Sequence, residues 1–474
     1  MLENRKINDF PLTLTDENGR VYHLEKKIGE GGQGAVFLAQ EKGIAIKLMR
    51  TNPSGKFEFN NMSDIKERQE AFKKIKNISL DDIEIKYPIS ILSFPYLGYV
   101  MEILDDMIPL KDLMFYEHDV LVPKDEESFK RYIETGGLKK RLKLLGKIAE
   151  TMSQLHSKGL VFADPSPDNF FISKDIDDDY ISLIDADNLE YQSKMSHKII
   201  YTPPYGAPEL VKGVSGVNTL TDAHAFAVIA FWMLTGVHPR YGDIVTEGEP
   251  EMEEKAQKGD IPWVDDENDN SNFTENGMPR KLVLSSNLQR LFKETFENGV
   301  NDYLKRPSLV EWENVLNEAL HSLISCECGF HYYANNEICP LCGEKKPQTV
   351  LINIKSWLPP KKEIDWEGGL SSFGTSIASI VLTENIKTNI DSYLISGNRL
   401  NSENKLSLEY NAQKNEILIS NLDRGRYFIA SKNMKDKVLI KRKHNFLIPN
   451  REDDLMIHFD SEKNYHRVIT FVKF

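Results

Sequence analysis

Glycines are concentrated between two apolar segments near the start of this chain, where residues 28–36 have the sequence IGEGGQGAV. Glycine lets the backbone turn sharply and come close to a bound phosphate. The next apolar segment ends in Ala45-Ile46-Lys47, and a lysine in that place can reach the phosphates of a nucleotide. Alternating apolar and polar residues across 20–50 predict strands around a turn. A hairpin turn would explain the glycines alone, so the lysine is what favours a phosphate site.

Two later segments place carboxylate and amide side chains beside short apolar stretches. In residues 160–170, LVFADPSPDNF, Asp164 is followed five residues on by Asn169, and Asp185 ends another apolar stretch. Asp164 could orient or deprotonate an attacking hydroxyl, whereas Asn169 and Asp185 offer the hard oxygen ligands that suit Mg²⁺. Each residue alone is common in turns. Their order and spacing after Lys47 favour one site for a metal-bound nucleotide, and without a GxxxxGK[ST] sequence a phosphate-loop NTPase is excluded.

These segments together resemble the eukaryotic-type serine/threonine protein kinases over roughly residues 20–320. The resemblance implies a two-lobed α+β protein-kinase fold that uses ATP and Mg²⁺ to phosphorylate serine or threonine hydroxyls of a protein substrate. It assigns catalysis to Lys47, Asp164, Asn169 and Asp185, of which Asn169 and Asp185 would be the Mg²⁺ ligands. It assigns ATP contacts in the first strands to Gly29, Gly31, Gly34, Val36, Ala45 and Lys47.

The same resemblance implies two further features around the nucleotide. Residues 99–104, YVMEIL, resemble the hinge that hydrogen-bonds adenine, with candidate contacts at Met101, in the gatekeeper position, Glu102 and Leu104. Lys47 should pair with a glutamate on the helix that follows its strand. Glu70 is the first choice for this partner and Glu67 the second.

Farther along, residues 202–209, TPPYGAPE, resemble the end of a kinase activation segment. The resemblance pairs Glu209 with Arg306 and places Asp222 at the head of the central helix. It gives all three residues structural roles. Thr202 resembles the threonine that contacts the catalytic aspartate in serine/threonine kinases, which favours acceptors of that type over tyrosine.

Several residues depart from the kinase pattern. Phe162 and Ala163 replace the histidine and arginine of HRD, Ser166 replaces the catalytic-loop lysine, and Ala186 replaces the aromatic residue of DFG. These changes leave a second hypothesis open, a nucleotide-binding pseudokinase that acts as a scaffold for partner proteins. A small-molecule phosphotransferase of the aminoglycoside-kinase type is a third, less favoured by the activation segment and Arg306.

All four cysteines lie close together, and two close pairs separated by about ten residues can converge on one tetrahedral ion. The sequence predicts a structural Zn²⁺ site made by Cys326, Cys328, Cys339 and Cys342. A glycine after each pair allows the tight turn that aims backbone N–H groups at sulfur. His331 could replace one ligand, although a fourth cysteine makes that unnecessary.

A narrower resemblance covers the DPSPDNF catalytic loop, the IDADN segment after it, the KGDIPW segment and the cysteine knot. These segments are similar to the bacterial kinase-like protein of the tellurite-resistance-associated phosphorylation triad. That likeness implies a bacterial signalling or stress-response role. It also implies a von Willebrand A-domain protein as partner and candidate substrate, and a partner phosphatase.

The chain of 474 residues is long enough for several domains. We expect a protein-kinase-like domain at 1–325, with an N-lobe at about 1–102 and a C-lobe at about 103–325. A zinc ribbon at 326–345, a linker at 346–364 marked by prolines, and a small all-β domain at 365–474 follow.

Charge and hydropathy exclude some classes of partner. A net charge of −13 disfavours a general nucleic-acid binder, which needs a basic surface. Apolar runs of bilayer-spanning length are missing from the sequence, which predicts no membrane insertion. The N-terminal residues lack the apolar core of a signal peptide, so we expect a cytoplasmic protein.

Overall fold

The computed structural model describes residues 10–51, 55–116, 119–120, 126–192, 198–357, 373–397, 403–431, 434, 436–452, 454–461 and 463–473. The chain divides into two compact units. The first comprises Met1–Gly136, Lys143–Met278 and Gln289–Glu313, and the second Gly137–Leu142, Pro279–Leu288 and Asn314–Phe474. Among the helices of the described residues, none combines the length and the apolar character that crossing a bilayer requires.

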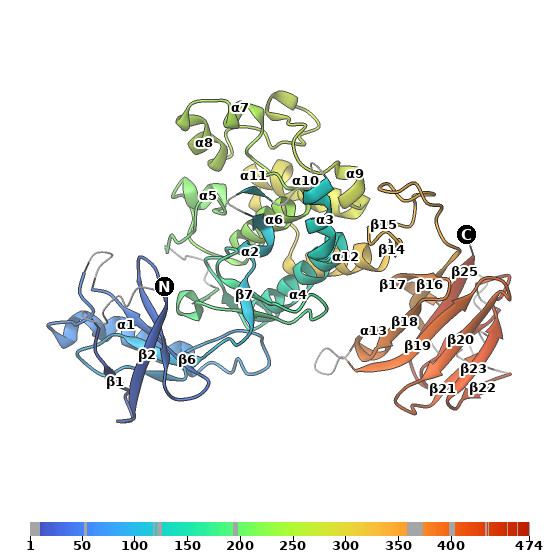
Figure 1. The fold of residues 1–474 in the computed structure, drawn as a ribbon, viewed down its shortest axis with the longest axis horizontal. Coiled ribbons are helices and arrows are strands. Elements are labelled where there is room, and N and C mark those ends of the chain that lie inside the picture. The colour runs from blue at the N-terminus through green and yellow to red at the C-terminus, as the bar shows by residue number, and fades with distance from the viewer. Residues whose placement is uncertain are drawn as a thin grey trace, which may run out of the picture. The chain divides into compact units, whose positions relative to one another are not determined.

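The N-lobe is a six-stranded antiparallel sheet with one helix, drawn in blue in Figure 1. Its strand order is β1-β2-β3-β4-β6-β5. Alternating side chains of these strands form an apolar core that includes Phe37, Ile46 and Val100. The elements are β1 (Thr13–Thr15), β2 (Val21–Glu30), β3 (Gly34–Ala39), β4 (Ile44–Met49), α1 (Met62–Lys76), β5 (Ser90–Ile91) and β6 (Gly98–Glu102).

The C-lobe is mainly helical. Its helices are α2 (Lys111–Met114), α3 (Glu126–Glu134), α4 (Gly137–Ser157), α5 (Pro208–Val211), α6 (Thr219–Thr235), α7 (Asp243–Thr246), α8 (Pro250–Gln257), α9 (Arg280–Val283), α10 (Ser286–Lys293), α11 (Gly299–Asn301) and α12 (Leu309–His321). Short strands accompany them: β7 (Met107–Pro109), β8 (Phe115–Tyr116), β9 (Asp119–Val120), β10 (Leu160–Val161), β11 (Phe170–Ser173), β12 (Ile181–Leu183) and β13 (Glu190–Tyr191).

Helix α6 is the centre of this lobe, and nearly all of its side chains are buried. Asn218 caps its N-terminus by accepting from the backbone N–H groups of Leu220 and Thr221. Aromatic rings from α6 meet rings from later helices, with Phe231 and Phe292 centroids 5.0 Å apart. Residues 221–235 are apolar on nearly every side, which is the pattern that a buried helix requires.

The second unit carries the cysteine knot and a β-sandwich. Strands β14 (Leu323–Ser325) and β15 (His331–Tyr333) pair beside the knot. The sandwich has a six-stranded sheet, β17-β16-β25-β24-β21-β22, and a four-stranded sheet, β18-β19-β20-β23. Their bounds are β16 (Thr349–Trp357), β17 (Phe373–Thr383), β18 (Lys387–Asp391), β19 (Asn404–Asn411), β20 (Glu416–Asn421), β21 (Tyr427–Ala430), β22 (Val438–Ile440), β23 (Lys443–Leu447), β24 (Met456–His458) and β25 (His466–Lys473), with α13 (Ser392–Ser396) between β18 and β19.

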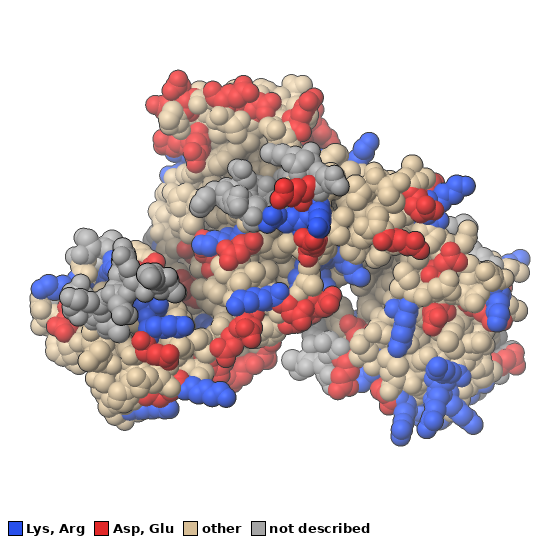
Figure 2. Space-filling model, viewed as in Figure 1, with Lys and Arg blue, Asp and Glu red and all other residues tan. Residues whose placement is uncertain are grey.

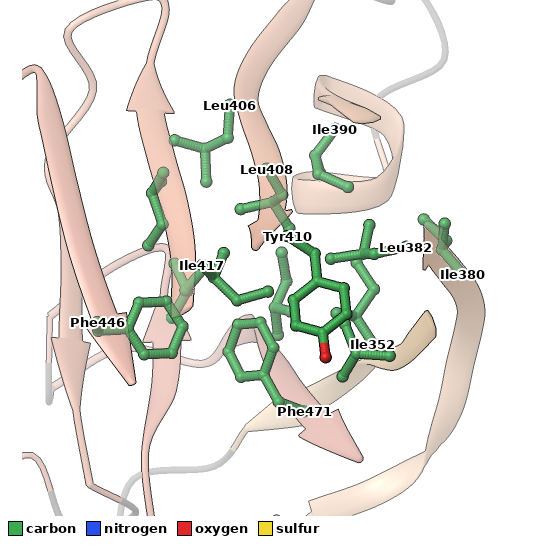
Figure 3. Close-up of a cluster of buried hydrophobic side chains, with 14 of the residues drawn as sticks. Ile352, Ile380, Leu382, Ile390, Leu406, Leu408, Tyr410, Ile417, Phe446 and Phe471 are labelled. Carbon is green, nitrogen blue, oxygen red and sulfur yellow. The ribbon is translucent and has the colours of Figure 1, made fainter. Parts of the chain in front are cut away.

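Apolar side chains from both sheets meet in one core (Figure 3). Ile352 and Phe471 come from the six-stranded sheet, and Leu408 and Ile417 from the four-stranded sheet. Every strand pair within the two sheets is antiparallel, which lets one face of each sheet bury its apolar residues. An all-β C-terminal region is therefore present.

The linker predicted at 346–364 needs correction. Residues 349–357 form β16, which pairs with both β17 and β25 inside the larger sheet. The physical reason is the strict alternation of buried Val350, Ile352 and Ile354 with more exposed neighbours, a strand pattern that the nearby prolines obscured. Residues 358–364 of the linker and 365–372 of the predicted β domain lie outside the described residues.

Charged side chains are unevenly distributed on the face shown in Figure 2. Acidic residues are dense over α7 and α8. Basic residues gather over β22 and β23, where Lys437, Lys441, Arg442 and Lys443 are exposed.

Arg306 and Glu209 form a buried ion pair between the end of the activation segment and the chain just before α12. The two pairs of atoms, Nη1 with Oε1 and Nη2 with Oε2, are 2.6 and 2.7 Å apart. The Arg306 side chain is fully buried and also donates from Nε to the Gly299 carbonyl at 2.9 Å. The predicted pair is confirmed.

We expect Arg306→Ala to lower the free energy of unfolding by about 3–5 kcal/mol, because Glu209 would stay buried without its counter-ion. Denaturant unfolding of the two proteins measures this. Arg290→Ala is the matched control, since Arg290 pairs at the surface with Glu294 and Glu311 and its loss should cost at most about 1 kcal/mol. Equal losses in the two variants would contradict the prediction.

Two buried histidines of the sandwich share a hydrogen bond, with His458 Nδ1 and His466 Nε2 2.9 Å apart beside the Trp357 ring. Burial lowers the pKa of His458 to about 4 and also lowers that of His466. A histidine with a depressed folded-state pKa takes up protons more readily when unfolded. Its stability contribution is therefore complete above the ordinary pKa of 6.5 and is lost as the pH falls toward 4.

Unfolding of the sandwich should accordingly cost about 2 kcal/mol less near pH 5 than near pH 7.5. Denaturant curves followed by tryptophan fluorescence at the two pH values measure the difference. His458→Phe removes the titrating group and should flatten the pH dependence. A pH dependence that survives this substitution unchanged would refute the assignment to His458.

Candidate active site

Lys47 connects the N-lobe to the C-lobe through two carboxylates. It lies on β4, opposite Val36 of β3 and Tyr99 of β6. Its Nζ atom is 3.0 Å from Asp185 Oδ1 and 3.0 and 3.1 Å from the two oxygens of Asp187. Burial alone disfavours the charged ammonium, but the charges of Asp187 and Asp185 outweigh it, so the pKa of Lys47 is raised.

Asn169 and Asp185 are brought together by the antiparallel pairing of β11 and β12. Asn169 precedes β11 and Asp185 follows β12, and Phe170 pairs with Leu183 between them. The Ile184 N–H donates to the Asn169 carbonyl at 3.0 Å. Burial and the nearby Asp187 charge raise the pKa of Asp185, while Lys47 opposes them. An amide and a carboxylate oxygen at one end of a hairpin fit the donor set of a magnesium site.

Asp164 is fixed in place from three sides. The Asp222 carboxylate at the head of α6 accepts from the backbone N–H groups of Phe162 at 2.7 Å and Ala163 at 2.9 Å. Asn169 Nδ2 donates to the Asp164 carbonyl at 3.0 Å, and Thr202 Oγ1 donates to Asp164 Oδ2 at 3.0 Å. Asp222 lies at the head of the central helix and Thr202 contacts Asp164, as the sequence predicted.

One oxygen of Asp164 remains available. Oδ1 is buried and has no hydrogen-bond partner among the described residues. Burial raises the pKa of Asp164, and the Thr202 hydroxyl partly offsets this. A pocket beside it is lined mainly by the end of the activation segment, including Tyr201, Thr202, Tyr205 and Leu210. A carboxylate oxygen without a partner, in a residue that lines a pocket, can accept a proton from a hydroxyl group that reaches it.

The glycine loop is open on the side away from the sheet. A Cβ atom at Gly34 would lie 2.3 Å from the Leu48 carbonyl oxygen, so strand pairing alone demands glycine there. At Gly31 and Gly32 a Cβ atom would meet nothing within 4 Å. The protein's own packing leaves those two glycines unexplained, and backbone free of side chains fits close approach of a phosphate ligand.

The predicted ATP contacts Val36, Ala45 and Met101 lie on the neighbouring strands β3, β4 and β6. Ala45 is buried and pairs with Met101, which is half-buried, as are Val36 and Leu104. Glu102 is exposed, and its carboxylate accepts from Lys86 at 2.9 Å. Its backbone still lies at the end of β6, where the hinge is expected.

The structure does not bring Glu70 or Glu67 to Lys47. Glu70 is exposed and accepts from Lys73 of the same helix at 2.8 Å, and Glu67 is exposed as well. Asp187 and Asp185 occupy the position expected for the helix glutamate. Sequence reasoning missed Asp187, although a second carboxylate two residues after Asp185 was the available signal.

The residues that depart from the kinase pattern are buried. Phe162 stacks on Phe170 with ring centroids 6.0 Å apart. Ser166 is 2% exposed and Ala186 is fully buried. These positions are part of the C-lobe packing.

The four cysteine sulfurs of the second unit all lie within 4.8 Å of one another. Cys326 and Cys342 are 3.5 Å apart and Cys328 and Cys339 are 3.8 Å apart. Tetrahedral zinc with bonds of about 2.3 Å places its sulfur ligands roughly 3.8 Å apart, so the cluster fits this ion. His331 is not part of the group.

Gly329 and Gly343 each follow a cysteine pair with φ of 85° and 76°. This left-handed conformation suits glycine. The two glycines therefore form the tight turns predicted for the cysteine knot.

A lysine of a β-rich lobe facing carboxylates of a helical lobe, with an open glycine loop beside them, defines the protein-kinase class. Comparison with known families agrees. Residues 22–319 match the family described as protein kinase domain, which is more than half of the chain. The chain therefore belongs to the protein kinase family.

Several curated kinases are similar over this region. Serine/threonine-protein kinase PknD of Chlamydia trachomatis serovar D is 29% identical over 249 residues, 46% of this chain and 25% of that protein. Serine/threonine-protein kinase pkn2 of Myxococcus xanthus is 25% identical over 47% of this chain and 25% of its own length. Calcium/calmodulin-dependent protein kinase type 1B of Rattus norvegicus is 25% identical over 53% of this chain and 67% of that protein. The match thus spans about a quarter of the bacterial relatives.

We expect the purified protein to contain one zinc ion per chain, because four thiolates satisfy tetrahedral zinc completely. Elemental analysis after gel filtration measures the content. Cys328→Ser should lower the zinc content, whereas His331→Ala should leave it unchanged. A zinc-free folded protein, or loss of zinc in His331→Ala, would contradict this site.

Proposed function

We propose that this kinase transfers the γ-phosphoryl group of ATP to serine or threonine hydroxyls of a protein substrate. The observation that carries the proposal is the convergence of Lys47 from β4 with the hairpin that holds Asn169 and Asp185. Asp164 is joined to the same hairpin through Asn169. These are the groups that phosphoryl transfer requires, in one place.

In this proposal the residues divide the work. Lys47 would hold the ATP phosphates, while Asn169 and Asp185 would hold Mg²⁺. The bound Mg²⁺–ATP supplies the transferable phosphoryl group and neutralises charge during transfer. The free Oδ1 of Asp164 accepts a hydrogen bond from the acceptor hydroxyl and orients that hydroxyl for in-line attack.

Thr202 supports acceptors of the serine/threonine type. Its hydroxyl holds Asp164 Oδ2, which leaves Oδ1 for the acceptor. The pocket beside Asp164 is lined by the same activation-segment end, so that segment would also contact the substrate. The curated relatives include proteins named serine/threonine-protein kinase, which agrees with this acceptor class.

The partner proposal rests on the narrower resemblance of the catalytic loop and the cysteine knot. We propose a von Willebrand A-domain protein as substrate in a bacterial signalling system, with a phosphatase that reverses the modification. The zinc knot and the sandwich are then candidates for holding that partner, and the kinase domain for modifying it.

The direct test incubates the protein with γ-labelled ATP, Mg²⁺ and a purified A-domain protein. We expect label on serine or threonine of the acceptor. Asp164→Ala and Asp185→Ala should each lower the transfer rate by roughly a hundredfold or more, since they remove the acceptor-orienting group and a metal ligand. Asp168→Ala is the control, because its carboxylate is exposed and pairs with Lys111.

The same experiment separates the two hypotheses. ATP binding with no transfer to the A-domain protein or to the kinase itself would overturn the enzyme proposal and favour the scaffold. Transfer that persists in Asp164→Ala would show a contaminating kinase.

A further inference from the structure

The strongest contacts of Lys47 are made with Asp187. Nζ donates to both oxygens of this carboxylate, at 3.0 and 3.1 Å, but to only one oxygen of Asp185. The Tyr99 hydroxyl donates to Asp187 Oδ1 at 3.0 Å. The Asp187 side chain is 4% exposed, whereas that of Asp185 is 32% exposed. Asp187 is therefore held inside the protein, and Asp185 keeps an open side for a ligand.

Helix α1 presents apolar groups toward this region. Ile65 and Phe72 are buried against the sheet, and the Phe72 ring lies 5.3 Å from the Tyr99 ring. The buried side of α1 runs through Ile65 and Phe72. Because an α-helix has 3.6 residues per turn, Glu67 and Glu70 lie on the opposite side.

Gln69 is a half-buried polar residue of α1. It is a neutral amide, and its Nε2 atom donates to the Leu92 carbonyl at 3.1 Å. Among the side chains of α1 that the structure describes, none supplies an anion to Lys47.

We propose that Asp187 is the positioning residue for Lys47, with Tyr99 fixing the carboxylate, in place of a glutamate from α1. This inference deepens the proposed function and rests on it. In protein kinases the pairing of this lysine with a helix glutamate makes its position depend on that helix. Here the anchor belongs to the 3₁₀ turn Ala186–Asn188, directly after the metal-binding aspartate.

Two consequences follow for the catalytic arrangement. Asp185 can turn to the metal ion while Asp187 keeps Lys47 in place, because the two carboxylates contact Nζ independently. Lys47 receives its anion from the turn after β12 and that anion is fixed by β6, while α1 acts on the pair through packing, because it contacts that turn and places Phe72 against Tyr99.

The test compares Asp187→Asn, Asp187→Glu and Tyr99→Phe with Glu70→Gln, which changes the expected helix partner. The first measurement is acetylation of Lys47 by acetic anhydride in the nucleotide-free protein, followed by mass spectrometry. The second is binding of AMP-PNP with Mg²⁺ by calorimetry. The third separates kcat from KM for ATP, and thermal unfolding records whether each variant is folded.

We expect Asp187→Asn to speed acetylation of Lys47 and to weaken AMP-PNP binding roughly tenfold or more, as loss of a charged buried hydrogen bond implies. Compared with Asp187→Asn, Asp187→Glu should return the acetylation rate and AMP-PNP binding part of the way to the wild-type values. Tyr99→Phe should change both quantities in the same direction as Asp187→Asn, but by less. Glu70→Gln should match the wild type.

Changes in Glu70→Gln as large as those in Asp187→Asn would overturn the inference, as would unchanged acetylation and binding in Asp187→Asn. Should Asp187→Asn fail to fold, Tyr99→Phe against Glu70→Gln decides the question. Acetylation and AMP-PNP binding need no turnover. An inactive wild type with these expected shifts would thus contradict the proposed enzyme while supporting the role of Asp187.

Discussion

The contact between the buried ammonium of Lys47 and the carboxylates of Asp185 and Asp187 is the interaction around which the kinase site is arranged. Burying a charge is costly unless it is paired, and here one cation faces two anions. Burial and the nearby Asp187 charge raise the pKa of Asp185, and Lys47 opposes them. A divalent cation beside Asp185 would offset the second negative charge of this cluster.

Two other buried carboxylates, those of Asp222 and Glu209, fix the conformation of neighbouring segments. Asp222 accepts two backbone N–H groups of the catalytic loop, where Ala163 has a φ of 76°. Glu209 fixes the end of the activation segment through Arg306. Phe162 and Ala163, near Asp164, stand where the kinase pattern has histidine and arginine. The loop geometry survives because these contacts come from Asp222 and do not need those side chains.

The second unit is stabilised in two distinct ways. The cysteine knot is too small for a core of its own, and its four sulfur atoms lie close enough together to bind one ion, which would take the place of a core. The sandwich has a continuous apolar core between two antiparallel sheets. Exposed basic residues flank β22 and begin β23, which are edge strands of the two sheets, and charge there opposes pairing with other chains.

The sequence alone determined the kinase fold, the Lys47, Asp164, Asn169 and Asp185 set, and the cysteine cluster, because each depends on residue types at short, recognisable spacings. It also determined the buried helix α6 and the Glu209–Arg306 pair. Only the tertiary structure decided that β16 belongs to the sandwich and that Asp187 serves Lys47. Both depend on which segments meet in space: the phase of α1 turns Glu67 and Glu70 outward, and the β11–β12 hairpin carries Asp187 across to β4.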